Sequence, residues 1–395
     1  KIKVIKNIAN KIIEFVSHIE NFQKKLWEKK KFVLGTEYVI TTDRVPEESY
    51  DEIWKNKEQK KEWKDLGFEI PKTKQELKKK ELPIDTKYFG KEFKEKLLEK
   101  LTEKADLDDL LDGLLIKSEN WQALNLILGK YKEKVKCIYI DPPYNTGSDE
   151  FLYRDRYQHS SWLSMMENRL KLAKELMRKD GVIFVSIDDN EVDNLKLLLK
   201  RFFPFTESLI WRKAHERYGK MKNTKTARIE HDYVLFSYSL DVLFNKIKIV
   251  PKFNQKPKQD EKGKFYVGYI ARGEKGSNPE HANYYTVHSS NEKEFTAQFE
   301  IPKEEFLKLD KERRIYWTEA GIPYRKIYLQ ELRKVVMPSI LYDNEEYGTT
   351  YEAKKRFIDL NMNWSEFVSD LNPKPLFLLK HICESSSKKE SLILD

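Results

Sequence analysis

The sequence predicts an α/β fold in which a mostly parallel sheet is flanked by helices. Three observations lead to this prediction. Strand-like and helix-like segments alternate from Leu110 onward, at the spacings typical of strand–helix–strand units. The residues before that point read as charged, helical segments. Between about 205 and 340 the alternation stops, and short Tyr- and Phe-rich strand candidates indicate an inserted, β-rich domain.

Length and composition restrict the class of protein. The 395 residues suffice for two or three domains, and an apolar fraction of 39% is enough to form cores. Two distant cysteines, Cys137 and Cys383, exclude a disulfide framework and a thiolate zinc site. No apolar run approaches the roughly 20 residues that span a bilayer, and no signal peptide opens the chain. We therefore expect no membrane partner and a cytoplasmic location.

The net charge of +9 is concentrated in one segment. Between Trp211 and Lys275 the sequence has sixteen Lys or Arg and seven Asp or Glu, so this segment alone carries the whole excess. Basic residues interleaved with aromatic ones are typical of a nucleic-acid surface. A solvated, lysine-rich face would have the same composition, and charge alone leaves both interpretations open.

Each element follows from its local pattern. Apolar residues at three- and four-residue steps predict a helix at the amino terminus, namely Ile2, Ile5, Ile8, Ile12 and Phe15. Val135–Ile140 and Val182–Ile187 are strand candidates rich in β-branched residues. Further helices are expected after Ser118-Glu119-Asn120 and over about Ser161–Arg178, where Asp180-Gly181 stops the helix. Asp188-Asp189-Asn190 caps another expected helix, which runs to about Phe202. The last expected helix is Lys374–Ile382. A last strand is expected at Ser391–Leu394.

These patterns predict four regions. Residues 1–109 form a helical, charged amino-terminal region, and 110–245 form the first half of the α/β core. Residues 246–337 form the β-rich insert, and 338–395 return to the core.

One motif carries clear chemistry. Asp141-Pro142-Pro143-Tyr144-Asn145-Thr146-Gly147 follows directly after the predicted strand Val135–Ile140. The carboxyl end of a parallel strand is where open α/β sheets bind ligands. Two successive prolines fix the turn, so that the Asp141 carboxylate and the Pro142 carbonyl form a rigid pair of acceptors. Such a pair suits an exocyclic NH₂ group, and Tyr144 offers an aromatic face to a base rotated out of a duplex.

Asp141–Tyr144 resembles the DPPY motif of the amino-methyltransferases that modify adenine N6 in DNA. With His159–Leu163 downstream, the stretch is similar to the modification subunits of type III restriction-modification systems. Weaker matches follow in order at Asp180–Ile187, at His231–Leu235 and around Lys374-Pro375-Leu376. The resemblance covers about Leu110–Asp395. It implies a Rossmann-like methyltransferase core with a target-recognition insert, S-adenosylmethionine as methyl donor, and catalytic roles for Asp141, Pro142, Pro143 and Tyr144.

The resemblance also implies which residues bind the cofactor. In the family's permuted order, the β group, the glycine-rich cofactor loop comes last, and Leu392–Asp395 reads like the strand before it. We therefore expect the chain to be a fragment that ends just before this loop. The cofactor-binding residues that the resemblance assigns within it are Asp395, Lys374, Pro375, Ser118 and Asn120.

Double-stranded DNA is the expected partner, and a restriction nuclease subunit and a second copy of the chain are further candidates. The predicted nucleic-acid contacts are Lys220, Lys222, Lys225, Arg228, Trp162 and His159. Trp162 also begins an apolar helical face, and this pattern favours a core residue over a DNA-contacting aromatic. No metal site is expected, because the histidines have no ligand spacing.

Two other functions stay open. The same acceptor geometry suits an RNA or protein amino-methyltransferase, although the basic insert favours a polyanion. Alternatively, the chain is a DNA-binding and partner-docking module that is inactive without the cofactor loop.

Overall fold

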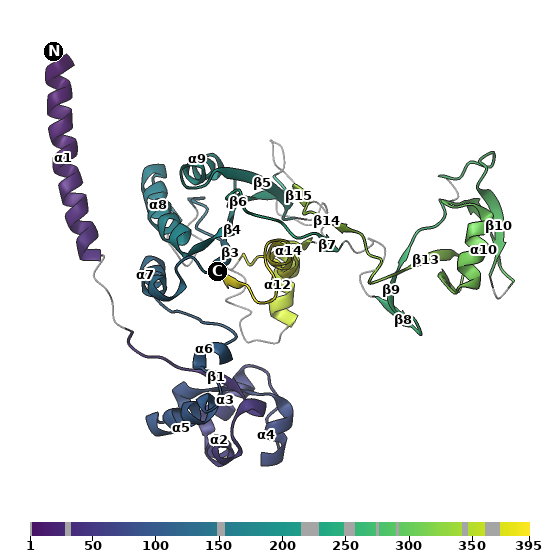
Figure 1. Ribbon diagram of the computed structural model, residues 1–395, viewed down its shortest axis with the longest axis horizontal. Coiled ribbons are helices and arrows are strands. Elements are labelled where there is room, and N and C mark those ends of the chain that lie inside the picture. The colour runs from purple at the N-terminus through teal and green to yellow at the C-terminus, as the bar shows by residue number, and fades with distance from the viewer. Residues whose placement is uncertain are drawn as a thin grey trace.

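The computed structural model describes residues 2–27, 33–147, 155–214, 229–248, 257–273, 276–289, 292–341, 347–359 and 372–395. A central sheet with its helices lies between a small amino-terminal unit and an extended β-rich insert (Figure 1). Lys220, Lys222, Lys225 and Arg228 fall outside the described residues. Among the helices that are described, none is both long and apolar enough to cross a membrane.

The central sheet confirms the predicted α/β fold. It has six strands, which lie across the sheet in the order β15 (Ile340–Leu341), β5 (Phe205–Arg212), β6 (His231–Tyr238), β4 (Met177–Ile187), β3 (Val135–Ile140) and β16 (Leu392–Leu394). Parallel pairs join β16 to β3, β3 to β4 and β15 to β5, whereas β6 is antiparallel to both of its neighbours. Five of the six strands therefore point the same way, and only β6 is reversed.

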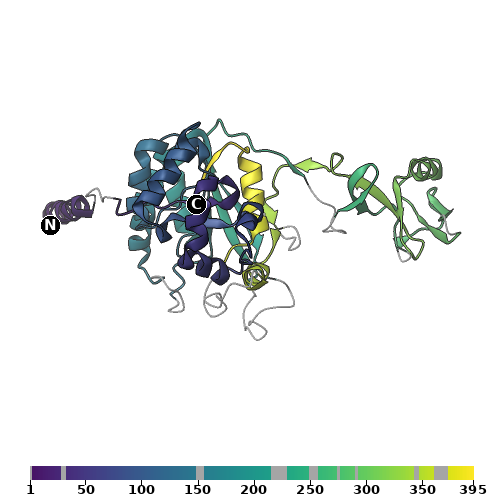
Figure 2. The same cartoon turned by 90° about the horizontal axis from the view of Figure 1, so that it is seen from below.

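Helices cover both faces of this sheet, which makes a three-layer core. On one face, α7 (Asn120–Tyr131), α8 (His159–Leu176) and α9 (Val192–Phe202) bury residues such as Trp162 and Leu195. On the other face, α14 (Leu376–Ser386) packs Leu378 and Ile382 against the strands. Figure 2 shows α14 separated from the helices of the first face. Neighbouring residues of β3 point into opposite layers because side chains alternate along a strand, so Ile138 belongs to the first layer and Cys137 to the second.

The boundaries at two polar turns, Asp180-Gly181 and Asp188-Asp189-Asn190, differ from the sequence prediction. Asp180-Gly181 does not stop a helix, because α8 already ends at Leu176 and β4 begins at Met177. Gly181 instead lies inside the strand, where an added Cβ atom would come within 2.4 Å of Met177 Cγ and 2.9 Å of the Arg178 carbonyl oxygen. Asp188 does not cap the next helix either, since its side chain accepts from Asn190 and α9 begins only after Glu191.

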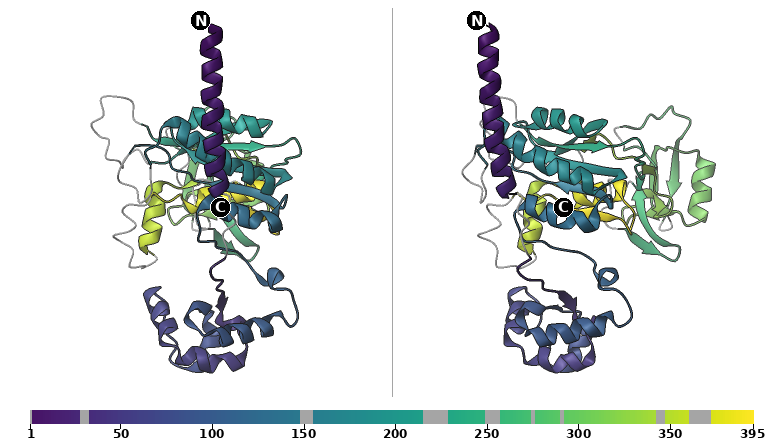
Figure 3. Two further views of the ribbon diagram at one scale, coloured as in Figure 1. Left: turned by 90° about the vertical axis from the view of Figure 1, so that its left-hand side faces the viewer. Right: turned by 60° about the vertical axis from the view of Figure 1, so that its left-hand side comes forward.

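The amino-terminal region has two parts. Helix α1 (Ile2–Trp27) stands apart from the rest, and an extended segment leads from residues 33–110 to the central sheet (Figure 3). Residues 33–110 form a small unit with its own core, which includes Ile53, Trp63, Leu77 and Ile84. The unit is not entirely helical, since β1 (Val39–Thr41) pairs with β2 (Pro83–Asp85). Its helical elements are η1 (Thr42–Arg44), η2 (Glu47–Ser49), α2 (Tyr50–Lys55), α3 (Lys57–Asp65), α4 (Lys74–Lys80), η3 (Thr86–Tyr88), α5 (Lys91–Thr102) and α6 (Leu107–Leu110).

The insert is β-rich and closed at its base. Its first strand, β7 (Ile247–Lys248), pairs with its last, β14 (Lys334–Val335). Beyond this ladder lies a four-stranded sheet with the strand order β12 (Ile315–Trp317), β13 (Pro323–Tyr328), β9 (Gly263–Gly268) and β8 (Lys258–Asp260). The insert also contains a hairpin of β10 (Tyr284–His288) and β11 (Glu294–Gln298), and the helix α10 (Lys303–Lys311). The chain then returns through β15 and α12 (Thr350–Asp359) to α14.

Candidate active site

The predicted catalytic turn leaves the sheet at its carboxyl edge. Strand β3 has sheet neighbours on both sides, and Asp141 is the first residue after it. The turn ends in left-handed backbone, with φ of +61° at Asn145 and +73° at Gly147. Asn and Gly tolerate this conformation better than other residues. Local sequence therefore dictates a fixed turn that begins with an accessible carboxylate.

The Asp141 carboxylate is held by a lysine from a distant part of the chain. Lys374 Nζ lies 2.9 Å from Asp141 Oδ1 and 2.7 Å from Oδ2, so one ammonium group contacts both oxygens. The same nitrogen is 5.0 Å from the centroid of the Tyr144 ring, within the range of a cation–π contact. The Lys374 side chain is only 9% exposed, whereas that of Asp141 is 35% exposed. Lys374 thus places a donating nitrogen next to both the Asp141 carboxylate and the Tyr144 ring.

Tyr144 combines a packed ring with an unsatisfied hydroxyl group. Its ring packs against the core layer that contains Trp162. Its hydroxyl is buried near the Asp141 carboxylate, but among the described residues it makes no hydrogen bond of acceptable geometry. Burial, and then the negative charge of Asp141, raise the pKa of Tyr144 well above its ordinary value. The phenol therefore stays neutral, and an orphaned polar atom marks this edge as a place for a polar ligand.

A second ion pair lies at the same edge. Asp232, at the start of β6, is buried, and its Oδ1 lies 2.6 Å from Lys213 Nζ, just beyond the end of β5. Burial raises the pKa of Asp232 even though Lys213 opposes this effect. Burial likewise raises the pKa of Asp188, with a smaller contribution from Asp232. Sequence reasoning included Asp232 in the weaker match at His231–Leu235 but gave neither Asp232 nor Lys213 a role in the site, although a single acid in an otherwise apolar strand was a signal for one.

The predicted cofactor residues are only partly brought together. Asp395 follows β16, which is parallel to β3, and desolvation together with the charge of Asp141 raises its pKa. Lys374 contacts Asp141, and Pro375 is the residue before the first turn of α14. Ser118 and Asn120 are exposed at the start of α7 and make no hydrogen bond or ion pair with this turn in the described part of the chain. A partly desolvated carboxylate beside another acid suits a cationic group, so Asp395 fits S-adenosylmethionine, whereas Asp141 is already paired with Lys374.

The structure describes two of the predicted nucleic-acid contacts, Trp162 and His159, and they differ in exposure. Trp162 is fully buried in the core layer, so the prediction that its indole contacts DNA is wrong and the alternative core interpretation is right. Its Nε1 donates to the Pro143 carbonyl over 2.8 Å, which ties α8 to the catalytic turn. His159 lies at the start of α8 with its side chain 68% exposed, and its Nδ1 is 2.7 Å from Glu191 Oε1. Nothing in the structure tests whether His159 contacts DNA.

A buried aspartate holds the far side of the turn. Asp155 Oδ1 accepts from the Asn145 backbone over 2.8 Å, and Oδ2 accepts from the Thr146 backbone over 2.9 Å. The Thr146 hydroxyl also donates to Asp155, and the Gly147 N–H donates to the Asp155 carbonyl. Sequence reasoning missed Asp155, because nothing local identifies its partners ten residues upstream.

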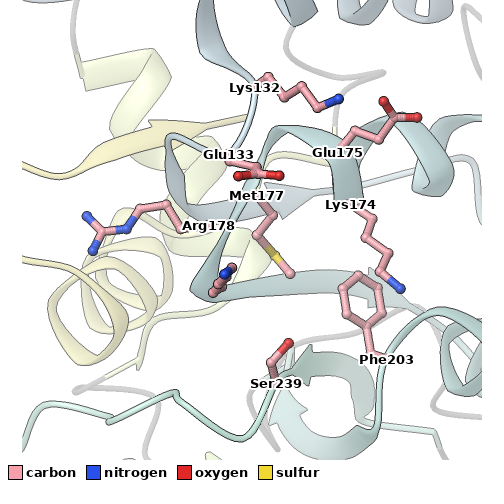
Figure 4. Close-up of a pocket in the computed structure, with 9 residues that line it drawn as sticks. Lys132, Glu133, Lys174, Glu175, Met177, Arg178, Phe203 and Ser239 are labelled. Atoms are coloured by element: carbon pink, nitrogen blue, oxygen red, sulfur yellow. The ribbon is translucent and has the colours of Figure 1, made fainter.

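Other features of the structure do not indicate a site. Burial raises the pKa of the Cys137 thiol to about 12, so this cysteine is a packing residue. Within the described ranges, no group of three His, Cys, Asp or Glu side chains is arranged to hold a metal. A pocket of about 430 Å³ lies at the opposite, amino edge of the sheet, and Figure 4 shows its lining, which includes Lys132, Lys174, Arg178, Phe203 and Ser239. It contains none of the predicted catalytic or cofactor residues.

Comparison with known proteins assigns the segment that contains this edge to a family. A family described as DNA methylase matches residues 135–395, which include β3, the catalytic turn and every later element. The chain belongs to the DNA methylase family. Its relatives include the StyLTI Mod subunit, a type III restriction-modification enzyme subunit of Salmonella typhimurium, which is 28% identical over 72% of this chain. The probable type III HindVI Mod subunit of Haemophilus influenzae is 52% identical over 23% of this chain.

The matches have limited extent. The chain spans about half of the Salmonella protein, 48% of its length, and the Haemophilus match covers 12% of that protein. A solved DNA modification methylase of Thermus thermophilus, in complex with S-adenosylmethionine, is 16% identical over 29% of this chain and 50% of its own, with a TM-score of 0.22. That likeness is too weak to define the arrangement of this chain.

Proposed function

We propose that this chain is the catalytic part of a DNA methyltransferase that transfers a methyl group from S-adenosylmethionine to adenine N6. The observation that carries the proposal is the Asp141 turn. Its carboxylate lies at the carboxyl edge of the sheet and accepts two hydrogen bonds from a single nitrogen, that of Lys374. An exocyclic amine requires the same kind of acceptor, and membership of the DNA methylase family supports DNA as its source.

The chain's own residues would prepare the amine for attack. The Asp141 carboxylate and the Pro142 carbonyl would accept hydrogen bonds from its two N–H groups and so orient the nitrogen lone pair. Tyr144 would stack on the flipped base, which is why its ring must be held in place. Lys374 contacts both Asp141 oxygens, one of which the amine would use, so its ammonium must release that oxygen when the target base enters. S-adenosylmethionine, when bound, would supply the electrophilic methyl group and would leave as the neutral thioether S-adenosylhomocysteine. The methylated nitrogen would then lose one of its protons to solvent. No covalent enzyme intermediate is needed, because an amine is already a nucleophile.

The names of the relatives support a type III modification subunit as the specific role. We propose duplex DNA as substrate, with the β-rich insert as the base-reading domain and His159 among the DNA contacts. A restriction nuclease subunit and a second copy of the chain are the proposed protein partners, and the cytoplasm is the proposed place of action. Co-purification of the complete protein with a restriction nuclease subunit, and light scattering of the complete protein alone, test these partners.

The test of the reaction is the variant Asp141→Asn in the complete protein. It keeps the shape of the side chain but removes the charge and one acceptor, so methyl transfer is expected to fall by about 100-fold or more. Asp180→Asn, at the amino edge of the sheet, is the matched control and is expected to retain its rate. Labelled methyl groups are followed into duplex DNA, RNA and protein, and the methylated nucleoside is identified. Normal DNA methylation by Asp141→Asn, or a product other than N6-methyladenine, would contradict the proposal.

A further inference from the structure

Glu191 is a buried acid with unusual partners. Its side chain is 0% exposed, and among the described residues it forms no ion pair with Lys or Arg. Glu191 Oε1 lies 2.6 Å from Asn145 Nδ2 and 2.7 Å from His159 Nδ1, and Oε2 lies 2.8 Å from Asn194 Nδ2. Although Glu191 directly precedes α9, its carboxylate makes no capping bond to that helix. Two of its three partners, Asn145 and His159, lie outside α9, so the carboxylate mainly makes tertiary contacts.

The Glu191 contact reaches the catalytic turn through Asn145. The Asn145 amide is fully used, because Nδ2 donates to Glu191 and to the Tyr157 carbonyl over 3.1 Å, and Oδ1 accepts from the Tyr157 N–H over 2.6 Å. Asn145 also has left-handed backbone, φ +61°, which contacts with the rest of the fold must maintain. Asn145 directly follows Tyr144, so its conformation decides where the Tyr144 ring lies.

Two helices therefore converge on one turn. From α8, Trp162 holds the Pro143 carbonyl, while His159, in the first turn of that helix, bonds to Glu191. From the start of α9, Glu191 holds Asn145. Because a carboxylate only accepts hydrogen bonds, all three side chains at Glu191 must present donors, and this fixes Asn145 with its amide nitrogen toward Glu191.

We propose that Glu191 is a positioning residue for methyl transfer, which acts through Asn145 to set the geometry of the Asp141–Tyr144 turn. The inference rests on the proposed function for its effect on rate, but the effect on the turn itself does not depend on that function. Glu191 touches neither Asp141 nor Tyr144 in the described contacts, so its role is to orient the groups that meet the substrate.

The first experiment measures the turn directly. Hydrogen exchange is followed by mass spectrometry in peptides that cover residues 144–147, for the wild-type protein and for Glu191→Gln. In Glu191→Gln one acceptor becomes a donor, and it faces the donating amides of Asn145 and Asn194. Exchange of the turn is expected to accelerate by about tenfold or more, while peptides from β5 and β6 exchange as before. Unchanged exchange at 144–147 overturns the proposal, whether or not the protein methylates DNA.

The matched control is Glu207→Gln. Glu207 accepts a hydrogen bond from the Tyr238 hydroxyl near the amino end of β5, away from the turn. It is expected to leave exchange at 144–147 unchanged. Acceleration at the turn by this variant as well would mean general loosening, and would also overturn the proposal.

The second experiment separates positioning from a merely structural role. In Asn145→Asp/Glu191→Gln the donor and acceptor across the pair are exchanged, so the hydrogen bond can form again. In the complete protein, Glu191→Gln is expected to lower kcat for methyl transfer by about 10- to 100-fold, with little change in the KM for the methyl donor. The double variant is expected to recover part of that loss. Equal loss in both variants, or an effect on KM alone, contradicts positioning through Asn145.

A third variant keeps the proposal testable if Glu191→Gln folds poorly. Asn145→Gly retains the left-handed backbone, since glycine adopts positive φ freely, but removes the side chain that Glu191 holds. It is expected to reproduce both the faster exchange and the lower kcat in a protein whose circular dichroism is unchanged, although the thermal unfolding midpoint should fall because the buried Glu191 carboxylate loses one donor. Wild-type kinetics in Asn145→Gly would overturn the inference. If wild-type protein shows no methyl transfer at all, the proposed function fails while the exchange experiment still decides the role of Glu191.

Discussion

The carboxyl edge and the amino edge of the central sheet both carry charged side chains, but they hold them in different ways. At the amino edge, the acidic group Asp180 is paired with Lys136 and Arg178 over 2.8–3.0 Å, beside the 430 Å³ pocket. At the carboxyl edge, charges are buried or shielded, as for Asp232, Lys374 and Glu191. A cavity of about 430 Å³ lies at the amino edge, and the acids whose pKa is raised lie at the carboxyl edge.

This difference indicates that desolvated acids, rather than the 430 Å³ pocket, mark the candidate site. The pKa values of Asp188, Asp232 and Asp395 are all raised at the carboxyl edge, with desolvation as the largest cause. Asp180 at the amino edge behaves in the opposite way. Partial burial works to raise its pKa, but hydrogen bonds and charges from Lys136 and Arg178 outweigh burial and lower it. Clustered groups with perturbed pKa values are typical of functional sites.

The largest expected effect on stability comes from breaking the buried pair at the carboxyl edge. Lys213→Met leaves the buried Asp232 carboxylate without its cation, which is expected to cost about 3 kcal/mol of unfolding free energy at pH 7. Urea unfolding measures this loss. In Lys213→Met/Asp232→Asn the buried charge is removed as well, so most of the loss should be recovered. A cost below about 1 kcal/mol in the single variant would indicate that the pair behaves like an exposed one.

A smaller effect concerns how the unfolding free energy depends on pH, since Asp180 at the amino edge and Asp232 at the carboxyl edge are expected to change it in opposite directions. The pKa of Asp180 is lowered, so its contribution to stability is present above the ordinary Asp pKa of about 3.9 and is lost as pH falls through its folded-state value. The pKa of Asp232 is raised, so the folded state binds its proton more readily and stability declines as pH rises from about 3.9 through the raised value.

Unfolding free energies measured from pH 3 to pH 7 test this difference in sign. Asp180→Asn should be destabilising at pH 7 and neutral at low pH. Asp232→Asn should be neutral or stabilising at pH 7, with its effect shrinking as pH falls. The same sign for both variants at pH 7 would remove the distinction between the edges.

The smallest expected effect is at the pocket of the amino edge. Lys174 donates to the Phe202 carbonyl over 2.6 Å from an exposed position. Lys174→Met is expected to change the unfolding free energy by less than about 0.5 kcal/mol and to leave methyl transfer unchanged. Thermal unfolding and the labelled-methyl assay measure both. A large loss of activity would show that the amino edge takes part in the reaction after all.

The local part of the site could be predicted from sequence, and the rest could not. The strand Val135–Ile140 and the Pro-Pro turn after it are short-range patterns, and the structure has them where they were expected. Lys374 is 233 residues from Asp141, and Glu191 is 46 residues from Asn145, so neither pair leaves a local signal. Trp162 shows the same limit, because a helix-face tryptophan can be core or surface until the packing partner is known.

The sequence by itself determined the alternation of strands and helices, the position of the DPPY-like turn at the end of a buried strand, and the β-rich character of the insert. Periodicity and turn chemistry act over a few residues, so they are readable from one chain. Tertiary structure alone decided which polar groups meet at the carboxyl edge: Lys374 on Asp141, Lys213 on Asp232, and Glu191 on Asn145. These pairings depend on sheet order and on the reversed strand β6, which brings the start of one strand beside the ends of the others.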